Sequence, residues 1–166
     1  MPARPLAIED LALLLPAKAR LLGLDLGART IGLALSDVER RIASPLLTIA
    51  RKKFAIDAAA LLQQIENYAI FALIIGMPFD LEGREGPRAQ STRAFARNLA
   101  GLTPTPIAFW DERFSTAAVE RDLIAHDVSR ARRAEVIDKM AAAYILQGAL
   151  DRLAGLSKAA QRQAAK

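Results

Sequence analysis

Three acidic residues occupy segments that should belong to the protein core. Asp25 lies within an apolar run of leucines, Glu112 directly follows another apolar run, and Asp138 lies on the small and apolar face of a helical pattern. A buried carboxylate costs several kcal/mol unless it is paired or binds a metal. Each of these acids therefore needs a partner, and the chemistry of the chain depends on what that partner is.

Two kinds of partner are compatible with the sequence. Each acid could have a local one: a backbone N–H for Asp25, Arg113 for Glu112, and Arg132 or Lys139 for Asp138. Alternatively the three carboxylates converge on one place. Because like charges repel, they could do so only if they shared a cation. Two Mg²⁺ ions about 4 Å apart can activate water and stabilise the leaving oxygen in phosphodiester cleavage. The joint occurrence of the acids favours this second interpretation.

Composition narrows the possible chemistry. The chain of 166 residues has no cysteine and one histidine, so any metal must be held by oxygen ligands, which favours Mg²⁺ or Mn²⁺. The formal net charge of +5 is compatible with a nucleic-acid partner, and equally with a basic surface that only confers solubility. The longest apolar run is far shorter than the ~20 residues of a membrane span, and no signal-peptide pattern is visible, so we expect no membrane partner.

The elements that must position these acids follow from apolar periodicity. Residues 20–36 predict a hairpin with its turn at residues 27–30, and the later strands alternate with helices, which predicts an α/β sheet covered on both faces. Residues 1–19 are predicted to be an appendage with a short helix, 20–153 a single domain, and 154–166 a flexible tail without an apolar stripe. The other expected elements are strands at 43–50, 71–76 and 105–110, and helices at 54–68, 87–100, 115 or 116 to about 126, and 130–153.

Four motifs resemble those of the YqgF/RuvX family of Holliday-junction-resolvase-like nucleases, also known as pre-16S rRNA nucleases. The resemblance covers about residues 21–153, and the order and spacing of the motifs make it specific. The motifs are Gly23-Leu-Asp-Leu-Gly27 with Arg29, Ile31-Gly32 and Ser36-Asp37; Ile75-Gly-Met-Pro78 with Gly83; Asp111-Glu-Arg113 with Thr116; and Ile137-Asp-Lys139 with Ala141-Ala142 and Gln147.

The resemblance implies an RNase H-like fold, with a mixed five-stranded sheet, the first three strands antiparallel and helices on both faces. It implies that Asp25, Glu112 and Asp138 are the catalytic carboxylates and bind the divalent metal. Asp111, which precedes Glu112, is a further candidate ligand outside that implied set. The resemblance also implies a cytoplasmic role in maturing the 5′ end of 16S rRNA, with precursor rRNA or a ribosomal particle as partner. The sequence leaves the oligomeric state open.

The chain departs from the family pattern at two places. Family members usually carry a Lys-Arg pair where this chain has Arg29-Thr30, and related junction resolvases carry a further acid where this chain has Ala141 and Ala142. The acidic cluster is thus three-membered unless Asp111 contributes.

Basic residues near the acids are candidates for binding nucleic acid. Arg29, Arg113 and Lys139 are close to the acids in sequence, and Arg93 and Arg97 share one face of a predicted helix. The basic cluster at residues 51–53 is predicted to be a solvated loop.

Three other functions compete with an RNA nuclease. A DNA junction resolvase would use the same acids, because both substrates are phosphodiesters. A non-catalytic RNA-binding assembly factor would keep the fold without cleavage. The turn at residues 27–32 also looks like the phosphate-binding hairpin of actin-like ATPases, but this chain lacks the second glycine-rich phosphate motif that those proteins need.

Overall fold

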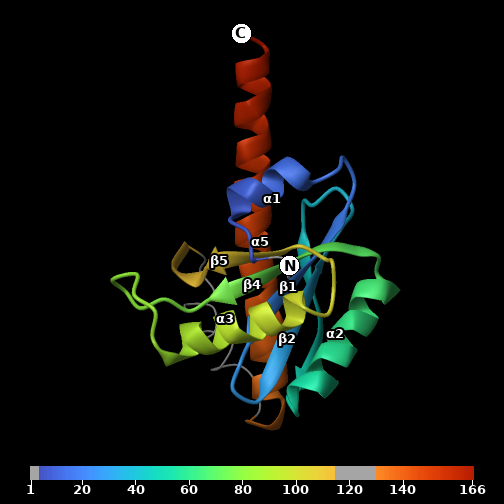
Figure 1. Cartoon of the computed structure of the whole chain (residues 1–166), viewed down its shortest axis with the longest axis vertical. Coiled ribbons are helices and arrows are strands. Elements are labelled where there is room, and N and C mark those ends of the chain that lie inside the picture. Colours follow the sequence, from blue (N-terminus) through green and yellow to red (C-terminus); the bar gives the residue numbers. More distant parts are fainter. Residues whose placement is uncertain (1–3, 115–129) are drawn as a thin grey trace.

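The computed structural model describes residues 4–114 and 130–166, and its centre is a five-stranded mixed sheet (Figure 1). The strand order is β3-β2-β1-β4-β5. β1, β2 and β3 pair antiparallel, and β1–β4 and β4–β5 pair parallel, which confirms the predicted topology. The strands are β1 Arg20–Leu26, β2 Thr30–Ser36, β3 Ala43–Ala50, β4 Ile70–Met77 and β5 Ile107–Asp111.

One face of the sheet is covered by the long helix α5, Arg130–Ala164, and by the short helix α1, Ile8–Leu14. Leu21, Ile74 and Ala108 point to this face and form one core cluster with residues of α5. Because side chains alternate along a strand, the odd-numbered residues of β1 all belong to this face, which includes Asp25.

The opposite face is covered by helices α2, Phe54–Asn67, and α3, Pro87–Ala100 (Figure 1). Leu22, Leu24 and Leu26 of β1 point to these helices and form the second core cluster. α2 contains one buried acid, Asp57, whose Oδ1 accepts a hydrogen bond of 2.9 Å from the Lys52 N–H just before the helix. An acid in the first turn also suits the positive end of the helix dipole.

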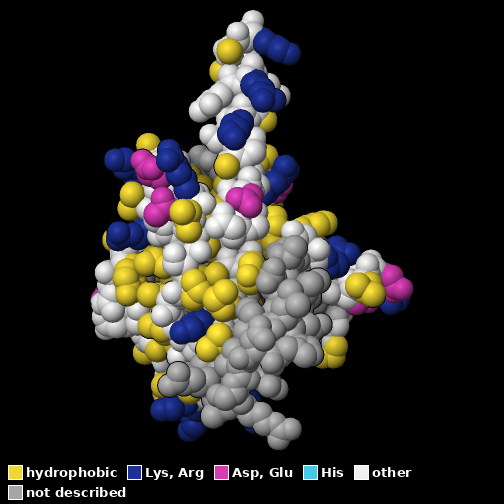
Figure 2. Space-filling view, turned by 180° about the vertical axis from the view of Figure 1, so that it is seen from behind, with side chains coloured by type: hydrophobic (Ala, Val, Ile, Leu, Met, Phe, Trp, Pro, Cys, Tyr) yellow, Lys and Arg dark blue, Asp and Glu magenta, His cyan; other side chains and the backbone are white. Residues whose placement is uncertain are grey.

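α5 is longer than predicted. The sequence predicts an end at Leu153, yet the helix continues to Ala164 and its last turns project beyond the sheet (Figure 1). Residues 154–164 are mostly Ala, Leu, Lys, Gln and Arg, which are strong helix formers, and they extend a helix already nucleated by packing. Figure 2 shows Lys and Arg side chains along this projecting end, and no acid follows Asp151 in the sequence.

The N-terminal segment packs on the domain through part of its apolar side chains. Leu11 is fully buried against the α5 side of the sheet, and Leu6 forms a parallel bridge with Ala108 of β5. The helix predicted from residue 115 or 116 to about 126 lies outside the described residues. Among the described helices, none is long and apolar enough to span a membrane.

Candidate active site

Asp25 lies near the carboxyl end of β1 and is only 2% exposed. Its direct partner on β2 is Gly32, and its preceding residue pairs with Ile75 of β4, so that Gly76 is its neighbour on the other side. Both neighbours of this carboxylate are therefore glycines on the face that α5 covers.

The gap at Gly32 is filled by the backbone of Asp138. A Cβ atom at Gly32 would overlap the carbonyl group of Asp138, so only glycine allows α5 to cross β2 at this point. Across an antiparallel pair, opposite residues have Cβ positions about 4.5–5.5 Å apart. The absence of a side chain at Gly32 thus brings the backbone of Asp138 down beside Asp25.

The gap at Gly76 is filled by the side chain of Glu112. A Cβ atom there would lie 2.7 Å from Glu112 Oε1 and 2.5 Å from Cδ1 of Ile145. Glu112 begins the 3-10 helix η1, Glu112–Phe114, directly after β5. The strand therefore delivers Glu112 to the same face and the same edge of the sheet as Asp25.

The three predicted acids thus lie on one face, with Asp25 between the positions occupied by Asp138 and Glu112. Within residues 4–114 and 130–166, no three acidic or histidine side chains lie close enough together to hold a metal ion between them. The donors themselves suit a hard divalent cation, because all three are carboxylates and the glycine at Gly76 leaves room for Glu112 Oε1.

Thr30 orients Asp138. The Thr30 hydroxyl donates a hydrogen bond to Asp138 Oδ2, from the first residue of β2 to the helix above it. At Gly27 a Cβ atom would lie 3.8 Å from the same oxygen. The departure from the family pattern at Arg29-Thr30 therefore supplies a partner for Asp138, which sequence reasoning missed.

Asp111, the candidate fourth ligand, is bound to an arginine. Arg113 donates to it through Nε at 3.0 Å to Oδ1 and through Nη2 at 2.6 Å to Oδ2. These hydrogen bonds raise the pKa of Arg113. The guanidinium also lies 5.6 Å from the ring centre of Phe79, so Arg113 ties the loop after β4 to η1.

The other predicted basic residues differ in their surroundings. Arg93 forms an ion pair with Glu85 and lies 5.2 Å from the ring centre of Phe109, on the α3 side of the sheet. The hydrogen bond between the Arg93 and Glu85 side chains raises the pKa of Arg93 and lowers the pKa of Glu85. Arg97 is exposed in the last turn of α3. Arg29 is exposed in the β1–β2 turn, and Lys139 follows Asp138 on α5.

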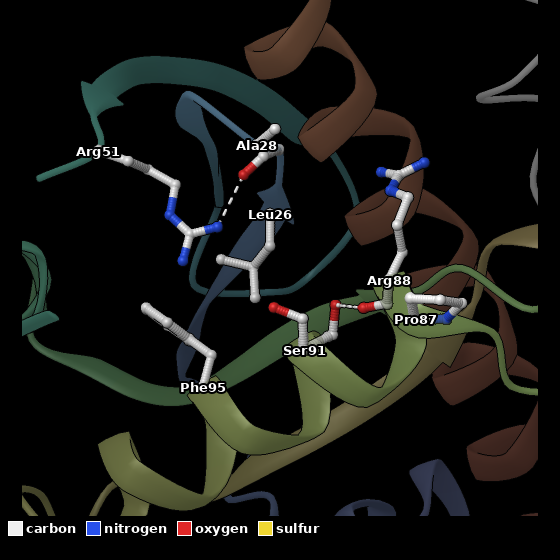
Figure 3. Close-up of a pocket in the computed structure, with 9 residues that line it drawn as sticks. Leu26, Ala28, Arg51, Pro87, Arg88, Ser91 and Phe95 are labelled. Atoms are coloured by element: carbon white, nitrogen blue, oxygen red, sulfur yellow. Dashed lines mark hydrogen bonds between the residues drawn. The ribbon is translucent and has the colours of Figure 1, made fainter.

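A pocket of about 250 Å³ opens on the other face of the sheet, beside the same turn (Figure 3). It lies between Gly27, Arg51 and the first turns of α3. Arg51 was predicted to be part of a solvated loop, but its Nη1 donates to the Gly27 carbonyl at 2.8 Å. No periodicity or motif marked it, because the contact joins the end of β3 to a turn 24 residues away.

Comparison with known proteins identifies the family. The model of the family described as "RuvX: Holliday junction resolvase" matches residues 19–152. A protein of Beijerinckia indica is 56% identical over 162 residues, with 98% of each chain covered. One of Methylocella silvestris is 59% identical over 153 residues, covering 92% of this chain and 95% of its own. Both are named as candidate pre-16S rRNA nucleases.

A solved structure supports the fold independently. RuvC of T. thermophilus in complex with a Holliday junction superposes with a TM-score of 0.52, over 83% of this chain and 97% of its own, at 14% identity. At that identity the likeness concerns the fold, which is RNase H-like. The full-length relatives and the family match together show that the chain belongs to the RuvX family of nucleases, enzymes that hydrolyse phosphodiester bonds.

Proposed function

We propose that this chain is a metal-dependent nuclease that trims precursor 16S rRNA at its 5′ end, in the cytoplasm. The observation that carries the proposal is the placement of Asp25 between two glycine positions that admit Asp138 and Glu112. The names of the full-length relatives favour precursor rRNA, free or in a ribosomal particle, as the substrate.

Asp25, Glu112 and Asp138 are the residues that would hold Mg²⁺ or Mn²⁺, and two ions are proposed because phosphodiester cleavage by metal ions commonly uses a pair of them. Such ions, when bound, activate the attacking water and stabilise the leaving oxygen of a phosphodiester. Asp111 is the weaker candidate ligand, because Arg113 already neutralises its carboxylate. The ligand set is therefore proposed to be three carboxylates from β1, η1 and α5.

The remaining residues orient these acids and the substrate. Thr30 holds one oxygen of Asp138, which leaves the other oxygen of that carboxylate for the ion. Arg29 and Lys139 are proposed to bind substrate phosphates, since they flank the turn and Asp138. Arg113 and Arg93 are engaged with Asp111 and Glu85, so their proposed contribution is to shape the loop of residues 78–86 along which nucleic acid would lie.

A four-way DNA junction is the second candidate substrate. The family description and the fold shared with a junction-bound resolvase favour it. A resolvase needs two copies to cut two strands symmetrically, whereas trimming a single RNA strand does not. Retention of the fold in a non-catalytic RNA-binding assembly factor is the third candidate, and it predicts binding without cleavage.

The test is cleavage of labelled precursor 16S rRNA and a labelled four-way junction, side by side, with Mg²⁺ and with EDTA. The expected result is Mg²⁺-dependent cleavage of the RNA that is lost in Asp138→Asn. Asp151→Asn is the matched control, since Asp151 is exposed on the same helix far from the turn. Cleavage that survives EDTA, or that both variants retain, would contradict the proposal. Preferential cutting of the junction would select the DNA substrate, and RNA binding without cleavage the assembly factor.

A further inference from the structure

The pocket beside the β1–β2 turn has a polar rim and an apolar floor (Figure 3). Arg51 lines it from the end of β3, and Arg88 and Ser91 line it from the first two turns of α3. Leu26 and Phe95 form its apolar floor and are 9% and 5% exposed. A cationic and hydroxyl rim above an apolar floor suits a molecule that has a phosphate next to a ring.

Arg51 is held in place by three groups. Its Nη1 donates to the Gly27 carbonyl at 2.8 Å, and its guanidinium carbon lies 5.6 Å from the ring centre of Phe95. Its Nε is 3.9 Å from Oδ2 of the buried Asp57. The hydrogen bond to Gly27 uses one of the five N–H donors of the guanidinium. Figure 3 shows the rest of that group facing the space above Phe95 and Leu26. A guanidinium fixed in this way loses little rotamer freedom when it binds a phosphate.

The electrostatic surroundings also favour an anion. Arg88 lies on the opposite side of the pocket from Arg51 (Figure 3). Arg29 is in the adjoining turn, where its carbonyl accepts the backbone N–H of Arg51 at 2.8 Å. α3 begins at Pro87 without a side-chain cap on its N-terminus, so the positive end of its dipole adds to the same potential.

The β1–β2 turn is a wall shared by the pocket and the acidic face. The carbonyl of Gly27 is bound by Arg51 on the pocket side, and a Cβ atom at Gly27 would lie 3.8 Å from Asp138 Oδ2 on the other. A phosphodiester chain that crosses this turn would therefore place one phosphate at Arg51 while an adjacent one reaches the carboxylates.

We propose that this pocket binds one nucleotide unit of the single-stranded substrate, next to the scissile phosphate. Arg51 and Ser91 hold its phosphate, and its sugar or base lies against Leu26 and Phe95. This rests on the proposed nuclease function and adds to it a binding site on the opposite face of the sheet. The chemistry recognised, a phosphate with an attached nucleoside, is also that of a free mononucleotide, and the test separates the two.

The decisive variant is Ser91→Glu, which adds a carboxylate at an exposed rim position. Its matched control is Asn98→Glu, the same charge change at an exposed position of the same helix outside the pocket. Affinity for a fluorescent single-stranded RNA is measured by anisotropy in EDTA, so that no cleavage occurs. We expect Ser91→Glu to weaken binding about tenfold, the scale of one hydrogen bond to a charged group, and Asn98→Glu to leave it within about twofold.

A second pair of variants tests Arg51 itself. Arg51→Gln should lower the slope of log affinity against log salt concentration by about one, the signature of one lost phosphate contact. Lys53→Gln removes an exposed charge from the same basic cluster outside the pocket and should leave the slope unchanged. Thermal unfolding of both variants shows whether loss of the contact between Arg51 and Asp57 destabilises the fold.

The outcomes separate this proposal from the nuclease function. Equal affinities of Ser91→Glu and Asn98→Glu for RNA would overturn the pocket assignment, even if the unaltered protein cleaves RNA. A strong difference between those variants in a protein that cleaves nothing would support the pocket and contradict the nuclease function. AMP that binds as tightly as the RNA and is lost in Ser91→Glu would show a free-nucleotide site and overturn the assignment to the substrate chain.

Discussion

At the carboxyl end of β1, the two faces of the sheet carry side chains of opposite charge. On the α5 face, glycines at 32 and 76 remove side chains and let Asp138 and Glu112 approach Asp25. On the α3 face, Leu26 keeps its side chain and arginines surround a small pocket. The difference teaches that one turn, residues 27–30, separates an acidic face, which we propose binds a cation, from a basic pocket, which we propose binds a phosphate. It predicts that chemistry and substrate binding are separable by mutation.

The largest effect should come from filling a gap on the acidic face. In Gly32→Ala, the new Cβ atom overlaps the backbone of Asp138, so α5 must move and the acids separate. We expect no cleavage and a loss of about 3 kcal/mol in the free energy of unfolding, as for strong overpacking. Urea denaturation and RNA cleavage measure both quantities.

Gly155→Ala is the control for that variant, because nothing lies within 4 Å of a Cβ atom there. It should stabilise the helix by up to about 1 kcal/mol and leave cleavage unchanged. A Gly32→Ala protein as stable and active as the parent would disprove the close approach of α5 to β2.

Thr30→Val tests the orientation of Asp138 without changing side-chain volume. The lost hydrogen bond to Asp138 Oδ2 should lower the cleavage rate about 10–100-fold, as for other outer partners of metal ligands. RNA affinity in EDTA should stay the same, because Thr30 serves the acidic face. Thr30→Ser should restore most of the rate, and a failure of this rescue would argue against the hydroxyl as the cause.

Arg93→Met tests whether an arginine that is already paired with a carboxylate contributes less to RNA binding than the pocket residues do. Because Arg93 is bound to Glu85, we expect RNA affinity to change by less than about twofold, well below the effect at the pocket. The pKa of Glu85, lowered by this hydrogen bond, should rise toward its ordinary value in an NMR titration. In the unaltered protein, the Glu85–Arg93 ion pair is fully formed above the ordinary pKa of a glutamate. It is lost as the pH falls through the lowered pKa of Glu85. An affinity loss matching that of Ser91→Glu would contradict this division.

The smallest effect should come from the projecting end of α5. Deletion of residues 158–166, all of them exposed, should change the free energy of unfolding by less than about 0.5 kcal/mol. Deletion from residue 153 removes Leu153, which is 6% exposed, and should be clearly destabilising. A large loss from the shorter deletion would mean that the end of α5 packs on the domain and does not simply project beyond the sheet.

The sequence predicted the sheet well because its strands are short apolar runs separated by clear turns. The hairpin around Asp25, the strand at residues 43–50 and the helix from Pro87 all appear at their predicted positions. The predicted position of the end of α5 was wrong, because the last turns of this helix depend on intrinsic helix propensity rather than on an apolar stripe. The burial of Asp57 was also missed. A helical pattern shows that the residue lies in a helix, but not that this part of α2 packs against the rest of the domain.

The site was only partly predictable. Asp25, Glu112 and Asp138 stand out because a carboxylate in an apolar segment is unusual, and their roles remain predictions. Thr30 and Arg51 carry no such signal, because a threonine or an arginine next to a turn is ordinary. Their roles arise from contacts across 108 and 24 residues of sequence, which only the folded chain brings together.

The most direct test of the central claim is the cleavage rate of Asp25→Asn on precursor rRNA at saturating RNA and Mg²⁺, with RNA affinity measured in EDTA. The substitution keeps the size of the side chain and removes the charge between Asp138 and Glu112. We predict a rate at least about 100-fold lower, the upper range seen when even outer metal partners are lost, with RNA affinity unchanged. Cleavage at the parental rate by folded Asp25→Asn would contradict the account.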